Sequence, residues 1–238
     1  MNWNTTADVV FLLNVDNTLL DNDRILADLR SQLEGAFGLA RAARYWLAFE
    51  SLRAELGYAD YLGALQRYRV DTAHGGCDDE QLLLISSFLI DYPFAERLYP
   101  HALDGVAHLG RLGPTVILSD GDVVFQPRNV QRSGVWDAAD GRVLINVHKD
   151  LMLDAVQRQH PARRYVMIDD KQRLLAAMKA VPGNRLTTVF PRQGHYALDP
   201  VNAGMYPAAD FAVDHIGDLL AAADAVWLSR ATPPAGSA

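Results

Sequence analysis

The chain has 238 residues, of which 50% are apolar and 21% charged, and its formal net charge is −7. An apolar fraction of this size is typical of a packed globular protein and excludes a largely disordered chain. The negative charge disfavours nucleic acid and anionic membranes as bulk partners, and no apolar run reaches the ~18–20 residues that a membrane span needs.

Short apolar runs rich in β-branched residues recur along the chain and alternate with helical patterns. The runs predict strands at Val9–Leu13, Thr115–Leu118, Tyr165–Ile168, Leu186–Phe190 and Phe211–Val213. The helical patterns cover Ala102–Leu112, Val123–Ser133, Leu151–His160 and Leu174–Ala180. Continuous apolar strands are typical of parallel sheets buried on both faces, so the alternation predicts an α/β fold with a mostly parallel sheet.

The segment that follows the first strand has a different periodicity. Its apolar residues recur every three or four positions, as in Ile25, Leu29, Leu33 and Phe37, and it contains no convincing strand. This pattern predicts an insertion of roughly four helices. The change of period at both boundaries divides the chain into a core of residues 1–20 and 98–238 and a helical segment of residues 21–97.

Polar and acidic side chains cluster where three of the predicted strands end. The clusters are Asn14, Asp16 and Thr18, then Ser119, Asp120 and Asp122, then Asp169 and Asp170. The carboxyl ends of parallel strands share one edge of a sheet, where ligands bind, and Lys149 lies on the connection into the third of these strands. Carboxylates, a hydroxyl and an ammonium at one point indicate Mg²⁺ together with a phosphate.

Each of these residues also has an ordinary structural explanation. Asp, Asn and Ser after strands commonly form turns and helix caps. Asp169 and Asp170 fit a surface loop, and Lys149 fits a solvated charge at a helix start. The functional interpretation therefore depends on the three clusters and Lys149 occurring together in one sequence.

The order of these motifs resembles that of the haloacid dehalogenase-like hydrolases. An apolar strand leads into Asn-x-Asp-x-Thr-Leu, a second strand ends in Ser, a Lys follows, and a third apolar strand ends in Asp-Asp. The resemblance runs from Val9 to about Leu220. It implies a Rossmann-like parallel sheet as the core domain, with residues 21–97 as the inserted α-helical cap domain of that family.

The resemblance also implies a role for each site residue. In the family, the first aspartate of Asp-x-Asp-x-Thr attacks phosphorus, and the second protonates the leaving group and then activates water. Asn14 holds the nucleophile position and Asp16 matches the acid–base residue. Thr18 matches the threonine of the motif, Ser119 matches the phosphate-binding hydroxyl, and Lys149 matches the lysine that steadies phosphate and nucleophile. The expected substrate-binding residues are Thr18, Ser119, Asp120 and Gly121.

The metal of the family is Mg²⁺, and the resemblance assigns its ligands here as well. The expected ligands are the Asn14 side chain, the Asp16 carbonyl and Asp170, with Asp169 beside them. The acid at Asp16 favours a phosphatase over a dehalogenase, because a departing halide needs no proton.

Asn14 is the departure from the family pattern. A neutral amide is a far poorer nucleophile than a carboxylate. Either the chain is an Asp-to-Asn variant made to trap a complex, or it is a natural non-catalytic relative. The sequence thus predicts a Mg²⁺-dependent phosphomonoester phosphatase scaffold with attenuated turnover, and the alternative is a pseudoenzyme that binds a phosphorylated ligand or protein partner.

The expected partner is a small phosphorylated metabolite, with no nucleic acid and no membrane. The predicted cap carries aromatic and arginine side chains, but their helical spacing is also typical of a packed core: Tyr45, Trp46, Arg53, Tyr58, Tyr61, Arg67 and Tyr68. Met1 to Asp8 lacks the layout of a signal peptide, and Cys77 is the only cysteine. These two features favour the reducing cytoplasm.

Overall fold

A computed structural model describes residues 6–71, 78–181, 185–202 and 204–221, and Cys77 lies outside these ranges. Its core is a parallel sheet of six strands in the order β3-β2-β1-β4-β5-β6. The strands are β1 (Ala7–Leu13), β2 (Thr115–Asp120), β3 (Val143–Asn146), β4 (Ala162–Ile168), β5 (Leu186–Pro191) and β6 (Phe211–Val213). The predicted α/β class with a parallel sheet is confirmed.

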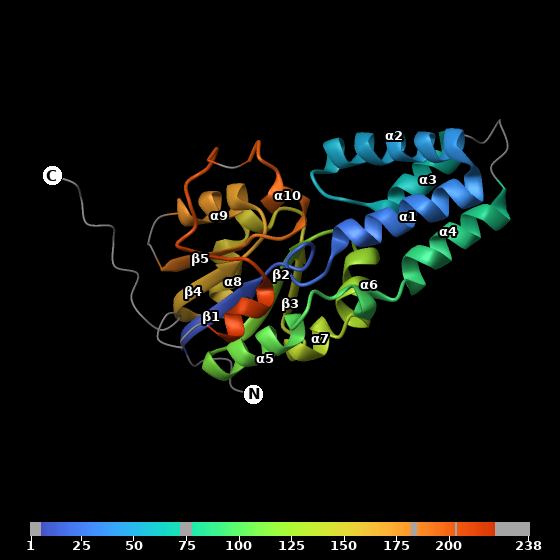
Figure 1. Cartoon of the computed structure of the whole chain (residues 1–238). Coiled ribbons are helices and arrows are strands. Elements are labelled where there is room, and N and C mark those ends of the chain that lie inside the picture. Colours follow the sequence, from blue (N-terminus) through green and yellow to red (C-terminus); the bar gives the residue numbers. More distant parts are fainter. Residues whose placement is uncertain (1–5, 72–77, 182–184, 203, 222–238) are drawn as a thin grey trace.

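Helices cover both faces of this sheet (Figure 1). They are α5 (Ala102–Leu112), α6 (Phe125–Arg132), α7 (Val135–Ala138), α8 (Leu153–Gln159), α9 (Gln172–Lys179) and α10 (Gly194–Leu198), with the 3-10 turns η1 (Phe94–Arg97), η2 (Lys149–Leu151) and η3 (Ile216–Leu220). Side chains of β1 alternate between the faces, because successive residues of a strand point to opposite sides. Phe11 packs with α5, α7 and η3, whereas Leu12 packs with α8 and α9.

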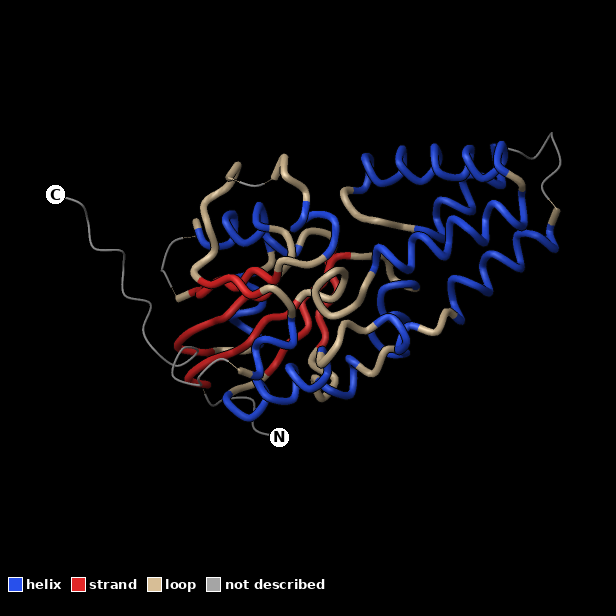
Figure 2. Tube along the Cα trace, in the orientation of Figure 1, coloured by secondary structure: helices blue, strands red, loops and turns tan. Residues whose placement is uncertain are grey.

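Four long helices follow β1 and form a separate layer beside the sheet (Figures 1 and 2). They are α1 (Asn22–Phe37), α2 (Leu39–Leu56), α3 (Tyr61–Asp71) and α4 (Asp79–Asp91). Their buried faces share one apolar cluster, which also takes in Phe94 and Phe125. The rings of Tyr61 and Phe125 are 4.8 Å apart and join this layer to α6. None of the helices in the described ranges is both long and apolar enough to cross a membrane.

The chain order places a crevice at the centre of the sheet. β1 has β2 on one side and β4 on the other, so the direction of strand succession reverses between β1 and β4. Ligands of open α/β sheets bind beyond the carboxyl ends of the strands at such a point. Leu13 and Ile168 end their strands side by side, so Asn14 and Asp169 emerge together at that edge.

Candidate active site

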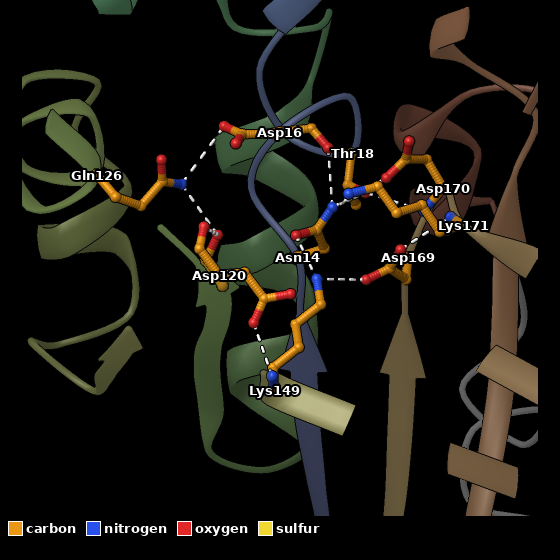
Figure 3. A network of polar contacts seen from close by, with 10 residues as sticks. Asn14, Asp16, Thr18, Asp120, Gln126, Lys149, Asp169, Asp170 and Lys171 are labelled. Carbon is orange, nitrogen blue, oxygen red and sulfur yellow. Dashed lines mark hydrogen bonds and ion pairs between the residues drawn. The ribbon is translucent and has the colours of Figure 1, made fainter. Parts of the chain in front are cut away.

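Asn14 lies at the centre of the site, and its amide group has a fixed orientation (Figure 3). Its Oδ1 accepts a hydrogen bond from Lys149 Nζ at 2.7 Å. Its Nδ2 donates to the Asp16 carbonyl at 2.8 Å and to Asp170 Oδ1 at 2.9 Å. In the reversed orientation, the Asn14 NH₂ group would face the Lys149 ammonium, and the Asn14 oxygen would face the Asp16 carbonyl and Asp170 Oδ1. The hydrogen-bond partners therefore determine the orientation of the amide.

The loop after β1 is a tight turn that separates Asp16 from Thr18. The Val15 carbonyl accepts the N–H groups of Thr18, Leu19 and Leu20 at 3.1, 2.8 and 3.0 Å. Asn17 takes the left-handed conformation, with φ of 56°, that asparagine tolerates better than most residues. Thr18 is buried, and its Oγ1 accepts the Asp170 N–H at 3.2 Å. Thr18 thereby attaches the first loop to the loop after β4.

Two amides of α6 hold the Asp16 carboxylate. Gln126 Nε2 and Asn129 Nδ2 lie 3.4 and 3.3 Å from Asp16 Oδ1, and Gln126 also donates to Ser119 Oγ at 2.9 Å. Burial raises the pKa of Asp16 above its ordinary value, which favours the protonated form that a general acid needs. Sequence reasoning missed Gln126 and Asn129. Their spacing of three residues, which puts both on one helix face, was the available signal.

The loop after β2 uses each of its polar residues differently. Asp120 Oδ1 accepts the Lys149 backbone N–H at 2.7 Å, and burial raises the Asp120 pKa. Asp122 Oδ1 accepts the N–H groups of Val124, which precedes α6, and of Phe125, its first residue, both at 2.7 Å. Asp122 thus has the ordinary role of a helix-start acceptor.

Gly121 makes room for Gln126. A Cβ on Gly121 would lie 2.6 Å from Gln126 Cβ, so a glycine lets α6 bring its amide to Asp16 and Ser119. The Gly121 N–H donates to the Asn146 carbonyl at 3.1 Å and so already has a partner. The substrate-binding role of Gly121 stays a prediction.

Lys149 and Asp169 form an ion pair inside the protein. Lys149 Nζ lies 2.7 Å from Asp169 Oδ2, and the two side chains are 1% and 0% exposed. These values exclude both ordinary explanations, a solvated lysine and a surface aspartate pair. An ammonium held between Asn14 Oδ1 and a carboxylate is positioned to stabilise charge at residue 14.

Asp170 and Lys171 complete the edge of the site. Burial, together with the neighbouring Asp169 carboxylate, raises the pKa of Asp170 to about 7. Burial acts to lower the pKa of Lys171, but the Asp170 and Asp169 carboxylates raise it above its usual range. Sequence reasoning gave Lys171 no role. Its position directly after the acidic pair was the available signal.

A cavity of about 830 Å³ opens above these residues, between the sheet edge and the helical layer. Asp16, Asp120 and Asp170 line it from the sheet side. From residues 21–97 come Arg30, Trp46, Phe49, Arg53, Tyr58 and Tyr61, and the α10 region adds His195 and Tyr196. Other aromatic and arginine side chains of the predicted cap do not line it. Tyr45 and Tyr68 lie in the packed interior, and Arg67 pairs with Glu55 at 2.8 Å.

Asn14 presents an amide nitrogen, not an oxygen, to the Asp16 carbonyl and to Asp170, the other expected ligands of Mg²⁺. Adjacent oxygen ligands of octahedral Mg²⁺ are about 2.9 Å apart, because each lies ~2.05 Å from the ion. The Asp16 carbonyl and Asp170 Oδ1 lie at this spacing from the Asn14 amide end, but the atom there is nitrogen. In the part of the chain that the structure describes, no three His, Cys, Asp or Glu side chains gather as a metal cluster. The residues as they stand do not fit the ion.

The family of this chain follows from its similarity to a solved structure. No protein-family model matches the sequence, and no curated protein matches it. A solved structure named as a haloacid dehalogenase-like hydrolase, from Burkholderia xenovorans LB400, is 62% identical to this chain. The match covers 94% of this chain and 99% of that one, with a TM-score of 0.87.

Two more distant structures share the fold. The L-2-haloacid dehalogenase from Xanthobacter autotrophicus is 19% identical, with a TM-score of 0.57 over 90% of this chain and 97% of that one. The HAD-hydrolase YfnB from Bacillus subtilis, whose structure is bound to magnesium, is 14% identical, with a TM-score of 0.57 over 91% and 98%. Identities this low show the fold alone, whereas the Burkholderia protein is similar in sequence over nearly its whole length. The chain belongs to the haloacid dehalogenase-like hydrolases.

Proposed function

We propose that this chain carries the site of a phosphomonoester hydrolase for small phosphorylated metabolites, with turnover attenuated by Asn14. The observation that carries the proposal is the Asp16 carboxylate at the cavity wall, held by two amide donors within the same site as the buried Lys149. A protonated carboxyl group there supports breakage of a bond whose leaving group needs a proton. Substrate phosphate would take Lys149 and Ser119 as partners, and Thr18 orders the loop beside it.

The proposed reaction requires a carboxylate at position 14. In an Asn14→Asp variant, the new carboxylate would attack phosphorus while the ester oxygen leaves with the proton of Asp16. Water would then cleave the aspartyl-phosphate, and Asp16 would take the proton of that water. We expect phosphate hydrolysis by the Asn14→Asp variant to depend on Mg²⁺. In the chain as given, the amide cannot form the intermediate, and only slow direct attack by water remains.

Residues 21–97 would act as the cap in this proposal. They supply one wall of the cavity, so they would exclude water and select the leaving group by shape. Arginine and tyrosine side chains on that wall suit a polar, phosphorylated molecule.

Two other functions compete with this one. A pseudoenzyme would bind a phosphorylated ligand or protein partner with the same Lys149 and Ser119, without turnover. The other is a dehalogenase, the activity named for the distant Xanthobacter structure. A halide leaves without a proton, so a dehalogenase would have no use for Asp16 as a general acid. The Asp16–Gln126–Asn129 arrangement therefore favours the phosphoester.

The deciding experiment compares phosphate release from p-nitrophenyl phosphate and a panel of phosphorylated metabolites by the parent and Asn14→Asp, with Mg²⁺ present. We expect the variant to exceed the parent by roughly a thousandfold or more, as nucleophile losses in other hydrolases indicate. Asp16→Ala in the Asn14→Asp background should lose most of the gain. If Asn14→Asp stays as inactive as the parent on the whole panel, the pseudoenzyme replaces the enzyme. If the parent is fully active and Asn14→Ala matches it, residue 14 is not the point of attack.

A further inference from the structure

The Asn14 amide nitrogen contacts three oxygens, and two of them belong to Asp16 and Asp170, the other expected ligands of Mg²⁺. Asn14 Nδ2 lies 2.8 Å from the Asp16 carbonyl, 2.9 Å from Asp170 Oδ1 and 3.1 Å from Thr18 Oγ1. All three partners are oxygens, the atom type that Mg²⁺ prefers. Asn14 Nδ2 therefore lies within hydrogen-bond distance of oxygens from both loops, the one after β1 and the one after β4 (Figure 3).

We propose that the Asn14 side-chain amide replaces a divalent cation in this chain, so that the site is ordered without metal and binds Mg²⁺ only weakly. The Asn14 N–H groups connect the loop after β1 to the loop after β4. A cation that took ligands from both loops would connect them in the same way. The inference relies on the proposed function only for the location of the site. It concerns the cation and makes no use of phosphate.

Rotating the Asn14 amide by 180° would turn its oxygen toward the expected metal ligands, but this rotation would cost free energy. Asn14 Oδ1 would have to leave Lys149 Nζ, at 2.7 Å, and the NH₂ group would then face that ammonium. Asn14 is 3% exposed and Lys149 1% exposed, so water cannot supply the lost hydrogen bonds. The pair Lys149–Asp169 holds the ammonium in place from its other side, at 2.7 Å.

An aspartate at position 14 changes this balance in both directions. Without metal, its second oxygen would face the Asp16 carbonyl and Asp170 Oδ1 at the present 2.8 and 2.9 Å, which is repulsive. With Mg²⁺, the same spacing becomes that of adjacent octahedral ligands. We therefore expect metal to stabilise Asn14→Asp and to leave the parent nearly unchanged.

The test uses the metal alone, as MgCl₂ against EDTA, on the full chain. Isothermal titration should show Mg²⁺ binding at least about tenfold tighter in Asn14→Asp than in the parent, a change typical of an altered metal environment. The Tm of Asn14→Asp should lie below the parent's in EDTA and rise with Mg²⁺, while the parent's Tm stays constant. Gln131→Glu, an exposed amide-to-acid change on α6, controls for added charge and should behave like the parent.

A second measurement does not depend on any variant. In the ¹⁵N spectrum of the parent, the Asn14 side-chain NH₂ should exchange slowly with solvent and keep its chemical shift when MgCl₂ is added. Equal Mg²⁺ affinity in parent and Asn14→Asp, or Asn14 NH₂ signals that move with Mg²⁺, would overturn the inference. So would a folded Asn14→Asp that binds no Mg²⁺. If these metal results hold while Asn14→Asp releases no phosphate from any substrate, the proposed function fails and the amide's role stands.

Discussion

His195 Nδ1 lies 2.5 Å from Asp23 Oδ1, which connects α10 at the sheet edge to the first turn of α1. The other oxygen of Asp23 accepts the His195 backbone N–H at 2.7 Å, and Asn17 Nδ2 donates to Asp23 Oδ1 at 3.0 Å. One carboxylate thus ties together the loop after β1, the start of the helical layer and α10. These contacts set the direction in which the chain leaves the sheet to form one wall of the cavity.

Replacing this carboxylate should loosen the connection without unfolding the protein. We expect Asp23→Ala to lower the free energy of unfolding by about 1–2 kcal/mol, because hydrogen bonds to a charged group are lost at a partly exposed site. Hydrogen exchange at the His195 amide should become faster. Asp8→Ala is the matched control, since Asp8 pairs with Arg163 only at 3.6 Å and both are exposed. An Asp23→Ala protein with unchanged His195 exchange would contradict the connection.

Asp28, Tyr92 and Arg97 form a second connection, and it predicts how stability depends on pH. Tyr92 Oη donates to Asp28 Oδ2 at 2.5 Å, and Arg97 Nη2 lies 2.8 Å from the same oxygen. The Tyr92 hydrogen bond, helped by Arg97, holds the pKa of Asp28 below its ordinary 3.8. A lowered pKa in the folded state stabilises the protein above the unfolded-state pKa, and that stability is lost as the pH falls below about 4.

Asp28→Asn should therefore flatten the acid side of the stability curve. We expect the parent to lose more unfolding free energy than Asp28→Asn between about pH 5 and about pH 3, as measured by urea denaturation. Burial and the Asp28 hydrogen bond raise the pKa of Tyr92 to about 12, so this residue adds a loss only as the pH rises above about 10. Asp79→Asn, at a highly exposed carboxylate, is the control. Parallel curves for parent and Asp28→Asn would show that the trio does not couple to folding.

Gly121→Ala tests whether the glycine serves Gln126. The new methyl group would lie 2.6 Å from Gln126 Cβ, so α6 must shift and the Gln126 amide would leave Asp16 and Ser119. We expect a loss of about 1–3 kcal/mol in stability, as for other overpacked sites. In the Asn14→Asp background, activity should fall by a similar factor in Gly121→Ala, in Gln126→Ala and in the double variant, because all three remove the same hydrogen bonds.

The control for that substitution is Gly110→Ala in α5. A Cβ at Gly110 meets no atom within 4 Å, and alanine is the better helix former, so this change should stabilise the protein by up to about 1 kcal/mol. If Gly121→Ala were equally harmless, Gln126 would not need the space.

The sequence was sufficient to predict five of the six strands and the carboxyl edge of the sheet where the site lies, but not the contacts between the side chains of the site. Runs such as Val9–Leu13 are buried on both faces, and burial is what makes a strand visible as an apolar run. β3 is a four-residue edge strand whose side chains are all half-buried, and the sequence analysis did not predict it. The acids and Lys149 follow strand ends or precede helices, so topology alone brings them together.

Contacts across the site depend on how side chains pack in three dimensions, and the spacing of residues in the sequence indicates these contacts only weakly. Gln126 and Asn129 look like surface amides until α6 is placed over Asp16, and Lys171 looks like a helix-start charge. The orientation of Asn14 depends on Lys149, which is 135 positions away in the chain. For this reason the sequence predicted the amide oxygen as a metal ligand, whereas the structure turns the nitrogen toward the Asp16 carbonyl and Asp170.

The buried pair of Lys149 and Asp169 should be sensitive to the loss of either partner. Lys149→Met has nearly the same length and no charge, so it leaves the Asp169 carboxylate and Asn14 Oδ1 buried without their ammonium partner. Breaking a buried pair from one side costs about 3–5 kcal/mol, far more than the pair itself contributes. Lys179→Met, which removes a partly exposed pairing with Asp210 at 2.7 Å, should cost only about 1 kcal/mol. Adding Asp169→Asn to Lys149→Met should restore part of the loss, because the stranded charge is removed with its partner. Urea denaturation of the four proteins, parent included, gives these differences. If the double variant is no more stable than Lys149→Met, the unpaired Asp169 carboxylate is not the cause of the instability, and the lost hydrogen bond to Asn14 must account for it.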